Sequence, residues 1–234
     1  MKAVILAGGY GKRLMPLTSK LPKPLLEVGG RPIIDWQLSW LRHSGISSFV
    51  ILCGYLKEKI MSHMDRIKKE LDIDADFVIE RTPLGTGGAL RNARKSIGDD
   101  TFMAINGDVL TNLDVKKLKL NGSMTAIALT QLRSPFGIVR SEKTVISRFD
   151  EKPFLRGYWI NAGAYLMNHG IFDYLPTRGD IERTAFSVLA ERRLLRGVKY
   201  HNVYWHSIDS IKDLEEASKD LRSGALGRWG RKAA

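Results

Sequence analysis

A glycine-rich loop surrounded by cations follows the first apolar segment of the chain. Residues 3–7 are apolar, and Gly8, Gly9 and Gly11 come directly after them. Glycine lets backbone amides approach a ligand closely, and loops that leave a strand of an α/β sheet often hold phosphates. Three cations follow within a short segment: Arg13, Lys20 and Lys23. These residue types indicate a phosphate-binding loop, with plain chain reversal as the alternative.

Lys23 is the cation whose backbone is most restricted, because it lies between Pro22 and Pro24. Proline fixes its own φ and limits the conformation of the residue before it. We therefore expect Lys23 to be aimed at a ligand. The loop matches neither of two common phosphate fingerprints, since it lacks the spacing G-x-x-x-x-G-K-[ST] and does not complete G-x-G-x-x-G.

Two carboxylates further along the chain also have positions suited to a ligand. Glu80 opens the segment Glu80-Arg81-Thr82-Pro83-Leu84-Gly85-Thr86-Gly87-Gly88-Ala89, which follows an expected strand and begins an expected helix. Asp108 follows Ile105-Asn106-Gly107 at the end of the next strand. Loops at the carboxyl ends of such strands are common ligand sites. The alternatives are a turn and helix start for the first segment, and a helix N-cap or Asx-turn for Asp108.

The N-terminal segment resembles the signature of the sugar-1-phosphate nucleotidyltransferases, also called nucleotide-sugar pyrophosphorylases. The matching residues are Leu6-Ala7-Gly8-Gly9-x-Gly11-x-Arg13-Leu14-x-Pro16-Leu17-Thr18 and Pro22-Lys23-Pro24. In that family, an oxygen of a sugar 1-phosphate attacks the α-phosphorus of a nucleoside triphosphate, and pyrophosphate leaves. The resemblance implies an enzyme that relies on cations and positioning and needs no protein nucleophile.

The resemblance also implies roles for single residues. Arg13 would neutralise the leaving pyrophosphate, and Lys23 would contact the α-phosphate or the sugar phosphate. Asp108 would bind Mg²⁺, which takes few protein carboxylates and fills its octahedron with phosphate oxygens and water. The nucleotide would be held by Leu6, Ala7, Gly8, Gly9, Gly11, Glu80, Gly85, Thr86 and Gly107.

The segment that begins at Glu80 resembles the family motif E-x-x-P-L-G-T-[AG]-G-A, which lies against the base. A carboxylate accepts hydrogen bonds from base edges that are rich in N–H donors, and guanine and cytosine have such edges. This favours GTP or CTP, and we give GTP a slight preference. Relatives that use UTP or dTTP share such a motif, so these nucleotides stay open.

Three motifs in the second half resemble the family's sugar-binding motifs. They are Phe136-Gly137-Ile138-Val139, Glu151-Lys152-Pro153 and Asn161-Ala162-Gly163. The resemblance implies that Gly137, Glu151, Asn161 and Gly163 contact the sugar and that Lys152 binds its phosphate. A mannose- or heptose-type sugar is slightly preferred.

The chain departs from the family pattern W-x-D-x-G-T-x-x-D at the second metal ligand. The corresponding segment is Trp205-His206-Ser207-Ile208-Asp209-Ser210-Ile211-Lys212-Asp213, with Ser207 at the usual aspartate position. Residues two apart share a face of an extended strand, so we predict that Asp209 supplies the second carboxylate. The alternative is that Asp209 caps the final helix.

Strands and helices are expected to alternate in the first half of the chain, which indicates a parallel sheet with crossover helices. The expected strands are 2–7, 48–53, 75–80 and 101–106, and the expected helices are 32–44, 55–71 and 86–96. From about residue 123, we expect strands at 123–132, 137–141, 144–150, 157–166 and 198–204, with helices at 168–174, 180–194 and 211–222.

The short turns between these later strands favour an antiparallel or mixed extension of the sheet. The expected fold class is α/β, a Rossmann-like three-layer sandwich with a mostly parallel central sheet and a mixed or antiparallel sugar-binding extension. We expect one domain, residues 1–226, with a nucleotide-binding half at 1–122 and a sugar-binding half at 123–226. A basic C-terminal tail, 227–234, follows.

The chain carries a net charge of +12, which suits anionic substrates, with nucleic-acid binding as the alternative. Its cations are dispersed and no nucleic-acid-binding motif accompanies them, so the sequence argues against nucleic acid. No apolar run reaches the roughly twenty residues of a membrane span. The single cysteine, Cys53, excludes an internal disulfide. We therefore expect a cytoplasmic enzyme that needs no membrane, with homo-oligomerisation left open.

Two other functions remain open at this point. One is nucleotidyl transfer to a non-sugar phosphate, such as phosphocholine or an inositol phosphate. The other is a non-catalytic regulatory homologue, although Arg13, Lys23, Asp108 and Lys152 are all present and argue against it.

Overall fold

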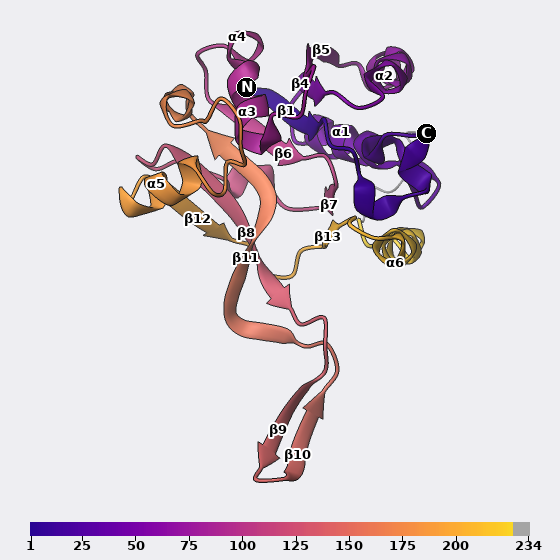
Figure 1. The fold of residues 1–234 in the computed structure, drawn as a ribbon, viewed down its shortest axis with the longest axis vertical. Helices are drawn as coiled ribbons and strands as arrows, with labels where there is room; N and C mark the ends of the chain where they lie inside the picture. The colour runs from indigo at the N-terminus through magenta and orange to yellow at the C-terminus, as the bar shows by residue number, and fades with distance from the viewer. Residues whose placement is uncertain (227–234) are drawn as a thin grey trace.

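The computed structural model describes residues 1–226, and its centre is a seven-stranded sheet (Figure 1). The strand order is β12-β8-β11-β6-β1-β4-β5. The strands are β1 (Lys2–Ala7), β4 (Ser48–Cys53), β5 (Asp74–Ile79), β6 (Phe102–Asn106), β8 (Thr125–Arg133), β11 (Phe154–Met167) and β12 (Leu195–Lys199). The predicted basic tail, 227–234, lies outside the described residues.

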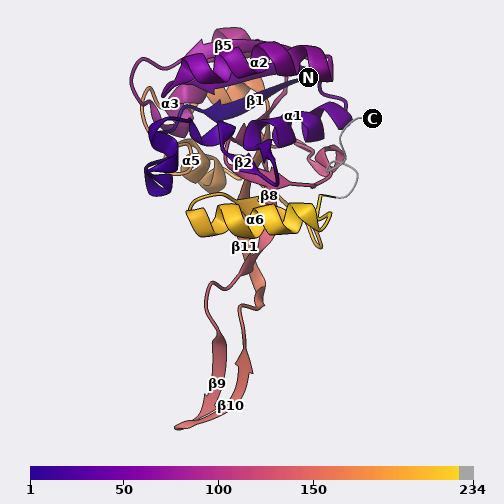
Figure 2. The same cartoon turned by 90° about the vertical axis from the view of Figure 1, so that its right-hand side faces the viewer.

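The first half of the chain forms the parallel part of the sheet. β1 pairs in parallel with β4 and β6, and β4 pairs in parallel with β5. Helices pack on both faces (Figures 1 and 2): α1 (Ile33–His43) and α2 (Lys57–Leu71) on one, and α3 (Gly85–Asn92), α4 (Arg94–Ile97) and α5 (Ala185–Glu191) on the other.

Both faces of the central strands are therefore buried, which explains why they are apolar at nearly every position. In β1, for example, Val4 packs into the cluster that contains residues of α3, and Ile5 packs into the cluster that contains residues of α1. The predicted α/β class with a three-layer arrangement is confirmed.

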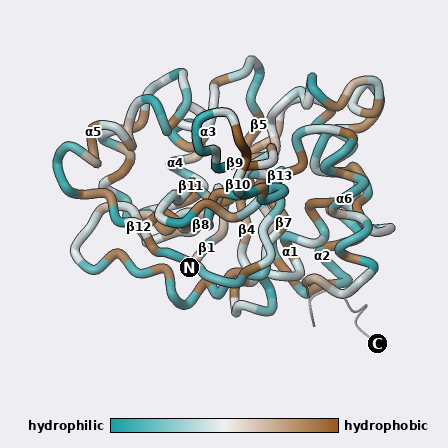
Figure 3. The backbone as a smooth tube through the Cα atoms, turned by 90° about the horizontal axis from the view of Figure 1, so that it is seen from below, coloured by the Kyte–Doolittle hydropathy of each residue, from teal (hydrophilic) through white to brown (hydrophobic). Residues whose placement is uncertain are grey.

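The second half adds the antiparallel part of the sheet. β11 runs antiparallel to both β6 and β8, and β12 runs parallel to β8. Two further strands, β9 (Ile138–Glu142) and β10 (Val145–Asp150), form a separate antiparallel pair that projects from the body (Figures 1 and 2). Seen from below, this pair stands in front of the centre of the molecule (Figure 3).

Several short elements complete the fold. β7 (Val109–Thr111) pairs with β13 (Trp205–Ser207), and β2 (Glu27–Val28) pairs with β3 (Arg31–Pro32). The last helix, α6 (Ile211–Arg222), packs Ala217 and Leu221 into a third apolar cluster, together with Val28 of β2 and Ile33 of α1. The 3₁₀ helices are Lys12–Leu14, Leu17–Ser19, Lys23–Leu25, Val115–Lys117 and His169–Asp173. Within residues 1–226, no helix has the length and apolar character needed to cross a membrane.

Several predicted elements were wrong in extent or type. The strand expected over 157–166 begins at Phe154, and the helix expected over 168–174 is a 3₁₀ helix. The helix expected over 180–194 begins only at Ala185, because the residues before it are hydrogen-bonded to the start of α3. The strand expected over 198–204 lies at Leu195–Lys199, and beyond it the Tyr200 hydroxyl donates to the carbonyl of Asp114. The helix expected over 86–96 is divided at Ala93, whose ψ of 2° interrupts the helical backbone.

Candidate active site

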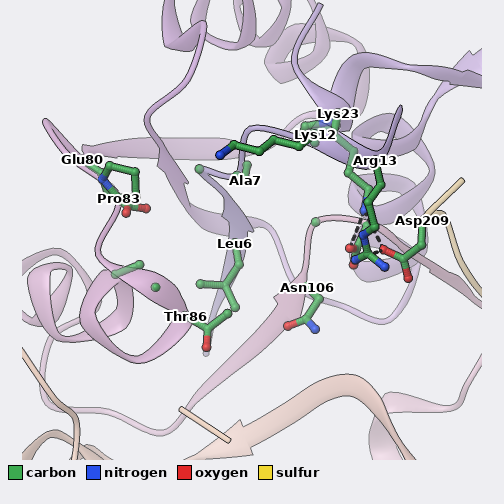
Figure 4. Close-up of a pocket in the computed structure, with 18 of the residues that line it drawn as sticks. Leu6, Ala7, Lys12, Arg13, Lys23, Glu80, Pro83, Thr86, Asn106 and Asp209 are labelled. Carbon is green, nitrogen blue, oxygen red and sulfur yellow. Dashed lines mark hydrogen bonds and ion pairs between the residues drawn. The ribbon is translucent and has the colours of Figure 1, made fainter. Parts of the chain in front are cut away.

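A cavity of about 390 Å³ lies at the carboxyl ends of β1 and β6 (Figure 4). This is the edge of a parallel sheet at which ligands commonly bind. All of the residues expected at the nucleotide and the metal line this one cavity: Leu6, Ala7, Gly8, Gly9, Gly11, Arg13, Lys23, Glu80, Gly85, Thr86, Gly107, Asp108 and Asp209. The structure thus brings together residues from segments that are up to two hundred positions apart in the chain.

Two glycines let the backbone fold tightly around this cavity. Gly107 donates its N–H to the carbonyl of Leu6, and a Cβ at position 107 would overlap that same oxygen. Gly11 has a φ of +61°, in the left-handed region that favours glycine, and packs against Thr18 and Lys23. Gly107 therefore keeps the end of β6 against β1, and Gly11 keeps the loop against the 3₁₀ turns that contain Thr18 and Lys23.

One end of the cavity is a cluster of cations and carboxylates. Nζ of Lys23 lies 2.7 Å from Oδ2 of Asp108 and 3.3 Å from Oδ1 of Asp209. Nη2 of Arg13 also lies 2.7 Å from Oδ1 of Asp209 (Figure 4). Lys23 is mostly buried in this cluster, whereas the Arg13 side chain is 77% exposed. The Arg13 guanidinium is therefore accessible to an incoming anion, whereas the Lys23 ammonium group is largely enclosed.

The two aspartates are held side by side by short strands that sequence patterns did not predict. Asp108 lies directly before β7 and Asp209 lies just after β13, and these two strands are paired. The N–H of Ile208 donates to the carbonyl of Asp108. This backbone bond fixes the spacing of the two carboxylates before any ligand binds.

Asp209 does not cap the final helix, which was the alternative interpretation of this residue. The N-cap of α6 is Ser210, which forms a capping box with Asp213. The carboxylate of Asp209 accepts a hydrogen bond from Ser207 at 2.9 Å and faces the cavity. Burial alone would raise the pKa of Asp209, but Lys23, Ser207 and Arg13 together hold that pKa below its ordinary value.

Asp108 and Asp209 have the chemistry to hold a divalent cation. Both carboxylates reach the same nitrogen atom of Lys23, so one ion at a similar position is within reach of both. Mg²⁺ prefers oxygen ligands and is commonly bound through one or two carboxylates together with substrate phosphates. The donor set therefore fits the expected magnesium site.

The opposite end of the cavity is formed by Glu80, Pro83, Gly85 and Thr86 (Figure 4). The carboxylate of Glu80 accepts a hydrogen bond from the N–H of Leu84 at 3.0 Å, which closes the turn before α3. Burial raises the pKa of Glu80, and the bond from Leu84 offsets only part of this effect. A half-buried carboxylate at this end is suited to accept hydrogen bonds from a ligand.

Two charged residues of the cavity were missed by the sequence analysis. Lys12 extends across the space between the two ends (Figure 4), and the carboxylate-bearing Asp180 also belongs to the lining. Lys12 adjoins the expected loop, so the excess of cations there was the available signal. The dipeptide Gly179-Asp180 has the composition of an ordinary turn. It lies against Gly85, which is some ninety residues away in the chain, so no local sequence pattern could have placed Asp180 in the cavity.

The expected sugar-binding residues fall into two groups. Asn161 and Gly163 lie beside the cavity, since Gly163 packs against Asn106, which is part of the lining. Gly137, Glu151 and Lys152 do not belong to the lining and lie at the projecting β9–β10 pair. The structure therefore brings only the first group close to the expected nucleotide site.

A chain of hydrogen bonds links Asn161 to the start of α3. The Asn161 amide donates to the hydroxyl of Tyr165 at 2.9 Å, and this hydroxyl donates to Oε1 of Glu182 at 3.5 Å. Oε2 of Glu182 accepts from the hydroxyl of Thr86 at 3.0 Å. Tyr165 is fully buried, and burial strongly raises its pKa, so the hydroxyl remains a donor at neutral pH. We call Asn161, Tyr165, Glu182 and Thr86 the relay.

Comparison with known proteins agrees with this geometry. The sequence model of the family described as nucleotidyl transferase matches residues 2–224. The chain is 35% identical over 226 residues to a protein of Candida albicans named mannose-1-phosphate guanyltransferase, and 34% identical over 227 residues to one of the same name from Saccharomyces cerevisiae. These alignments cover 91% of this chain and 62% of each relative, so the chain spans less than two thirds of the relatives' length.

Solved structures share the fold. HddC from Yersinia pseudotuberculosis is 27% identical, with a TM-score of 0.74 over 94% of this chain and 99% of that one. A second structure of HddC is complexed with GMP-PN. A structure from Bacillus anthracis is named putative glucose-1-phosphate thymidylyltransferase, and its TM-score is 0.76 over 98% of both chains. At 23% identity, this is a likeness in fold alone.

Proposed function

The chain belongs to the nucleotidyl transferase family, and we propose that it transfers a nucleotidyl group from a nucleoside triphosphate to a sugar 1-phosphate. One observation carries this proposal: a single cavity has Lys23, Asp108 and Asp209 at one end and Glu80 at the other. A triphosphate at the charged end and its base at the other would occupy both. The names of the relatives in yeasts support the same class of reaction.

In the proposed reaction, an oxygen of the acceptor phosphate forms a bond to the α-phosphorus. The bond between this phosphorus and the oxygen that bridges to the β-phosphate breaks, and the electron pair leaves with pyrophosphate. The reacting groups are all anionic, so the chain's main contribution is to fix cations where negative charge accumulates. Lys23 would contact the α-phosphate or the acceptor phosphate, and the exposed Arg13 would neutralise the leaving pyrophosphate.

Asp108 and Asp209 would hold Mg²⁺ at this end of the cavity. The ion, when bound, supplies positive charge to the phosphate oxygens and helps to align them. Lys23 pairs with the same two carboxylates, so its ammonium group would lie next to the ion and the phosphates.

The proposed base is guanine. Glu80 offers carboxylate oxygens to N–H donors of the base edge, and guanine presents two such donors, on N1 and N2. The relatives named guanyltransferases and the HddC complex with GMP-PN support this choice over CTP, UTP and dTTP. The proposed acceptor is mannose 1-phosphate or a sugar phosphate of similar shape, held by Asn161 and Gly163 beside the cavity. Gly137, Glu151 and Lys152 stay predicted contacts of the sugar phosphate, although they lie at the β9–β10 pair and outside the cavity lining.

The proposed location of the enzyme is the cytoplasm. The proposed activity is tested with a grid of nucleotides against phosphorylated acceptors. Purified protein with Mg²⁺ is assayed for pyrophosphate release with GTP, CTP, UTP or dTTP, each paired with several sugar 1-phosphates, phosphocholine or inositol phosphate. Release with GTP and mannose 1-phosphate at the highest kcat/KM supports the proposal. Release only with a non-sugar acceptor would replace it by transfer to that acceptor, and no release with any pair would favour a regulatory homologue.

A further inference from the structure

Lys12 is a cation of the cavity to which the proposed reaction gives no role. Three cations line the cavity, and two of them, Arg13 and Lys23, pair with carboxylates at its charged end. Lys12 forms no ion pair with any carboxylate that the structure describes, and its side chain is exposed. It is therefore a positive charge at the cavity that the protein leaves uncompensated.

The backbone of Lys12 is held on both sides by the glycine-rich loop. The carbonyl of Gly11 accepts a hydrogen bond from the N–H of Leu14 at 2.8 Å, and the carbonyl of Lys12 accepts one from the N–H of Met15 at 3.3 Å. Nζ of Lys12 lies 5.8 Å from the centre of the Tyr10 ring. This contact with the face of an exposed ring is weak, and it leaves the N–H donors of the ammonium group available to an anion.

Lys12 lies on the opposite side of the cavity from the proposed acceptor. The acceptor residue Gly163 packs against Asn106, and Figure 4 shows Asn106 and the ammonium group of Lys12 at opposite margins of the cavity. In phosphoryl transfer, the attacking and the leaving oxygen lie roughly in line, on opposite sides of the phosphorus. An acceptor that attacks from the side of Asn106 therefore expels pyrophosphate towards the side of Lys12.

The charges of the cavity leave the pyrophosphate short of cations without Lys12. When the bond to the α-phosphorus breaks, the electron pair stays on the pyrophosphate oxygen, and negative charge accumulates there. Arg13 is the other exposed cation of the lining, and it already pairs with Asp209. The lining holds more carboxylates than cations, namely Glu80, Asp108, Asp180 and Asp209. An unpaired ammonium group on the leaving side would stabilise the developing charge.

We infer that Lys12 is a second pyrophosphate-binding cation, which holds the β- and γ-phosphates of the bound triphosphate and then the pyrophosphate that leaves. This inference rests on the proposed function, because it places the acceptor and the nucleotide as that function does. Lys12 contacts neither the base nor the α-phosphate. Its effect is therefore confined to ligands that carry the two terminal phosphates, which makes Lys12 a determinant of selectivity for a triphosphate over a monophosphate.

Titration of the whole chain with inorganic pyrophosphate in the presence of Mg²⁺, followed by calorimetry, tests the inference without any turnover. Lys12→Met should raise the Kd for pyrophosphate by about tenfold or more, because a charge-assisted contact with a phosphate is lost. Lys12→Arg, which keeps the charge, should retain most of the affinity. The matched control is Lys59→Met, since Lys59 is an exposed lysine of α2 outside the cavity lining, and this variant should bind pyrophosphate as the wild type does.

A second titration compares GTP with GMP, which lacks the two terminal phosphates. Lys12→Met should weaken the binding of GTP by a similar factor and leave the binding of GMP unchanged. Equal weakening of both nucleotides would place Lys12 at the α-phosphate or the ribose and overturn the inference, as would an unchanged Kd for pyrophosphate or an equal loss in Lys59→Met.

These results are separable from a failure of the proposed function. A chain that releases no pyrophosphate with any substrate pair, but loses pyrophosphate affinity in Lys12→Met, would contradict the proposed transfer and support the role of Lys12. An active chain whose pyrophosphate affinity does not depend on Lys12 would do the reverse.

Discussion

Lys23 and Asp108 form an ion pair of 2.7 Å although 85 residues separate them in the chain. The same ammonium group reaches Asp209 at 3.3 Å, and Arg13 pairs with Asp209 at 2.7 Å, so two cations face two carboxylates that lie far apart in the sequence. The cluster is therefore charge-balanced before any substrate binds. Its members cannot be changed one at a time without leaving a partly buried charge uncompensated.

Lys23→Met should cause a large loss in the rate of pyrophosphate release and only a small loss in the free energy of unfolding. Loss of one group that stabilises developing charge costs about 10²–10³-fold in kcat. Lys20 is an exposed lysine of the same segment that does not line the cavity, so Lys20→Met is the matched control. Steady-state kinetics of both variants would separate a specific role from a general effect of charge, and an equal loss in Lys20→Met would argue for the latter.

Asp209→Asn should raise the Mg²⁺ concentration needed for half-maximal activity, because the second carboxylate of the proposed metal site is lost. Mutation of a residue that only hydrogen-bonds to a metal ligand changes the affinity for the metal by about 10–100-fold. For the loss of a ligand itself, we expect the required Mg²⁺ concentration to rise at least tenfold. Asp213→Asn is the control, since Asp213 belongs to the capping box of α6. That variant should lower the stability by about 1 kcal/mol and leave the Mg²⁺ titration unchanged. A metal requirement that Asp209→Asn does not alter would remove Asp209 from the site.

The affinity for the nucleotide should fall as the pH is lowered, and Glu80 should account for the change. Burial raises the pKa of Glu80, so this carboxylate takes up a proton at a higher pH than an exposed glutamate does. Once protonated, it loses most of its capacity to accept hydrogen bonds from the base. We expect KM for the nucleotide to increase as the pH falls through this raised pKa, and the dependence to flatten in Glu80→Gln.

The same raised pKa has the opposite sign for stability. A carboxyl whose pKa is higher in the folded than in the unfolded state is less favourable when ionised, so its cost appears as the pH rises through the unfolded-state pKa and is complete above the folded-state pKa. Glu80→Gln should therefore bind nucleotide more weakly at neutral pH without a loss of thermal stability. A large drop in Tm would instead assign Glu80 a mainly structural role in the turn that it forms with Leu84.

Tyr165→Phe should impair the use of both substrates, because it interrupts the relay between Asn161 and Thr86. Loss of a buried hydroxyl that both accepts and donates should lower the free energy of unfolding by about 1–3 kcal/mol. Tyr200→Phe removes another buried hydroxyl, which donates to the carbonyl of Asp114 away from the cavity. Denaturation and substrate titrations should show a stability loss in both variants but raised KM values only in Tyr165→Phe.

Gly107→Ala should disturb the end of β6, because a Cβ at this position would overlap the carbonyl oxygen of Leu6. Overpacking of this kind costs about 1–3 kcal/mol, and here it would also displace Asp108. Gly9→Ala, in the same loop region, has no atom within 4 Å of the added methyl group. It should retain the wild-type Tm, and comparable Tm values for the two variants would contradict the steric argument.

Local patterns predicted the elements that are long and regular. The strands at 2–7 and 48–53 and the helix at 211–222 have the predicted bounds, because each has a continuous apolar run or an apolar stripe bounded by turn and cap residues. The glycine-rich loop could be predicted for a similar reason, since its residue types and spacing are local. Glu80, Asp108 and Asp209 could be selected from the sequence because each stands next to a strand or helix end.

The remaining features depend on contacts that no local pattern contains. β7 and β13 have three residues each and exist only because they pair with each other. Asp180 reaches the cavity because the carbonyl of Gly179 accepts hydrogen bonds from Gly87 and Gly88, far away in the sequence. The motifs around Gly137 and Glu151 were expected at the acceptor, but their projection on an arm follows from the topology of β9 and β10.

The relay has a thermodynamic consequence for the two halves of the site. Thr86 belongs to the nucleotide end and Asn161 to the proposed acceptor end, and Tyr165 and Glu182 connect them without a gap. A ligand that orders one terminus of such a connection lowers the conformational entropy that the other terminus has still to lose. By linkage, the factor by which the nucleotide improves acceptor binding must equal the factor by which the acceptor improves nucleotide binding. Cooperativity between the substrates is then symmetric, whichever of them arrives first.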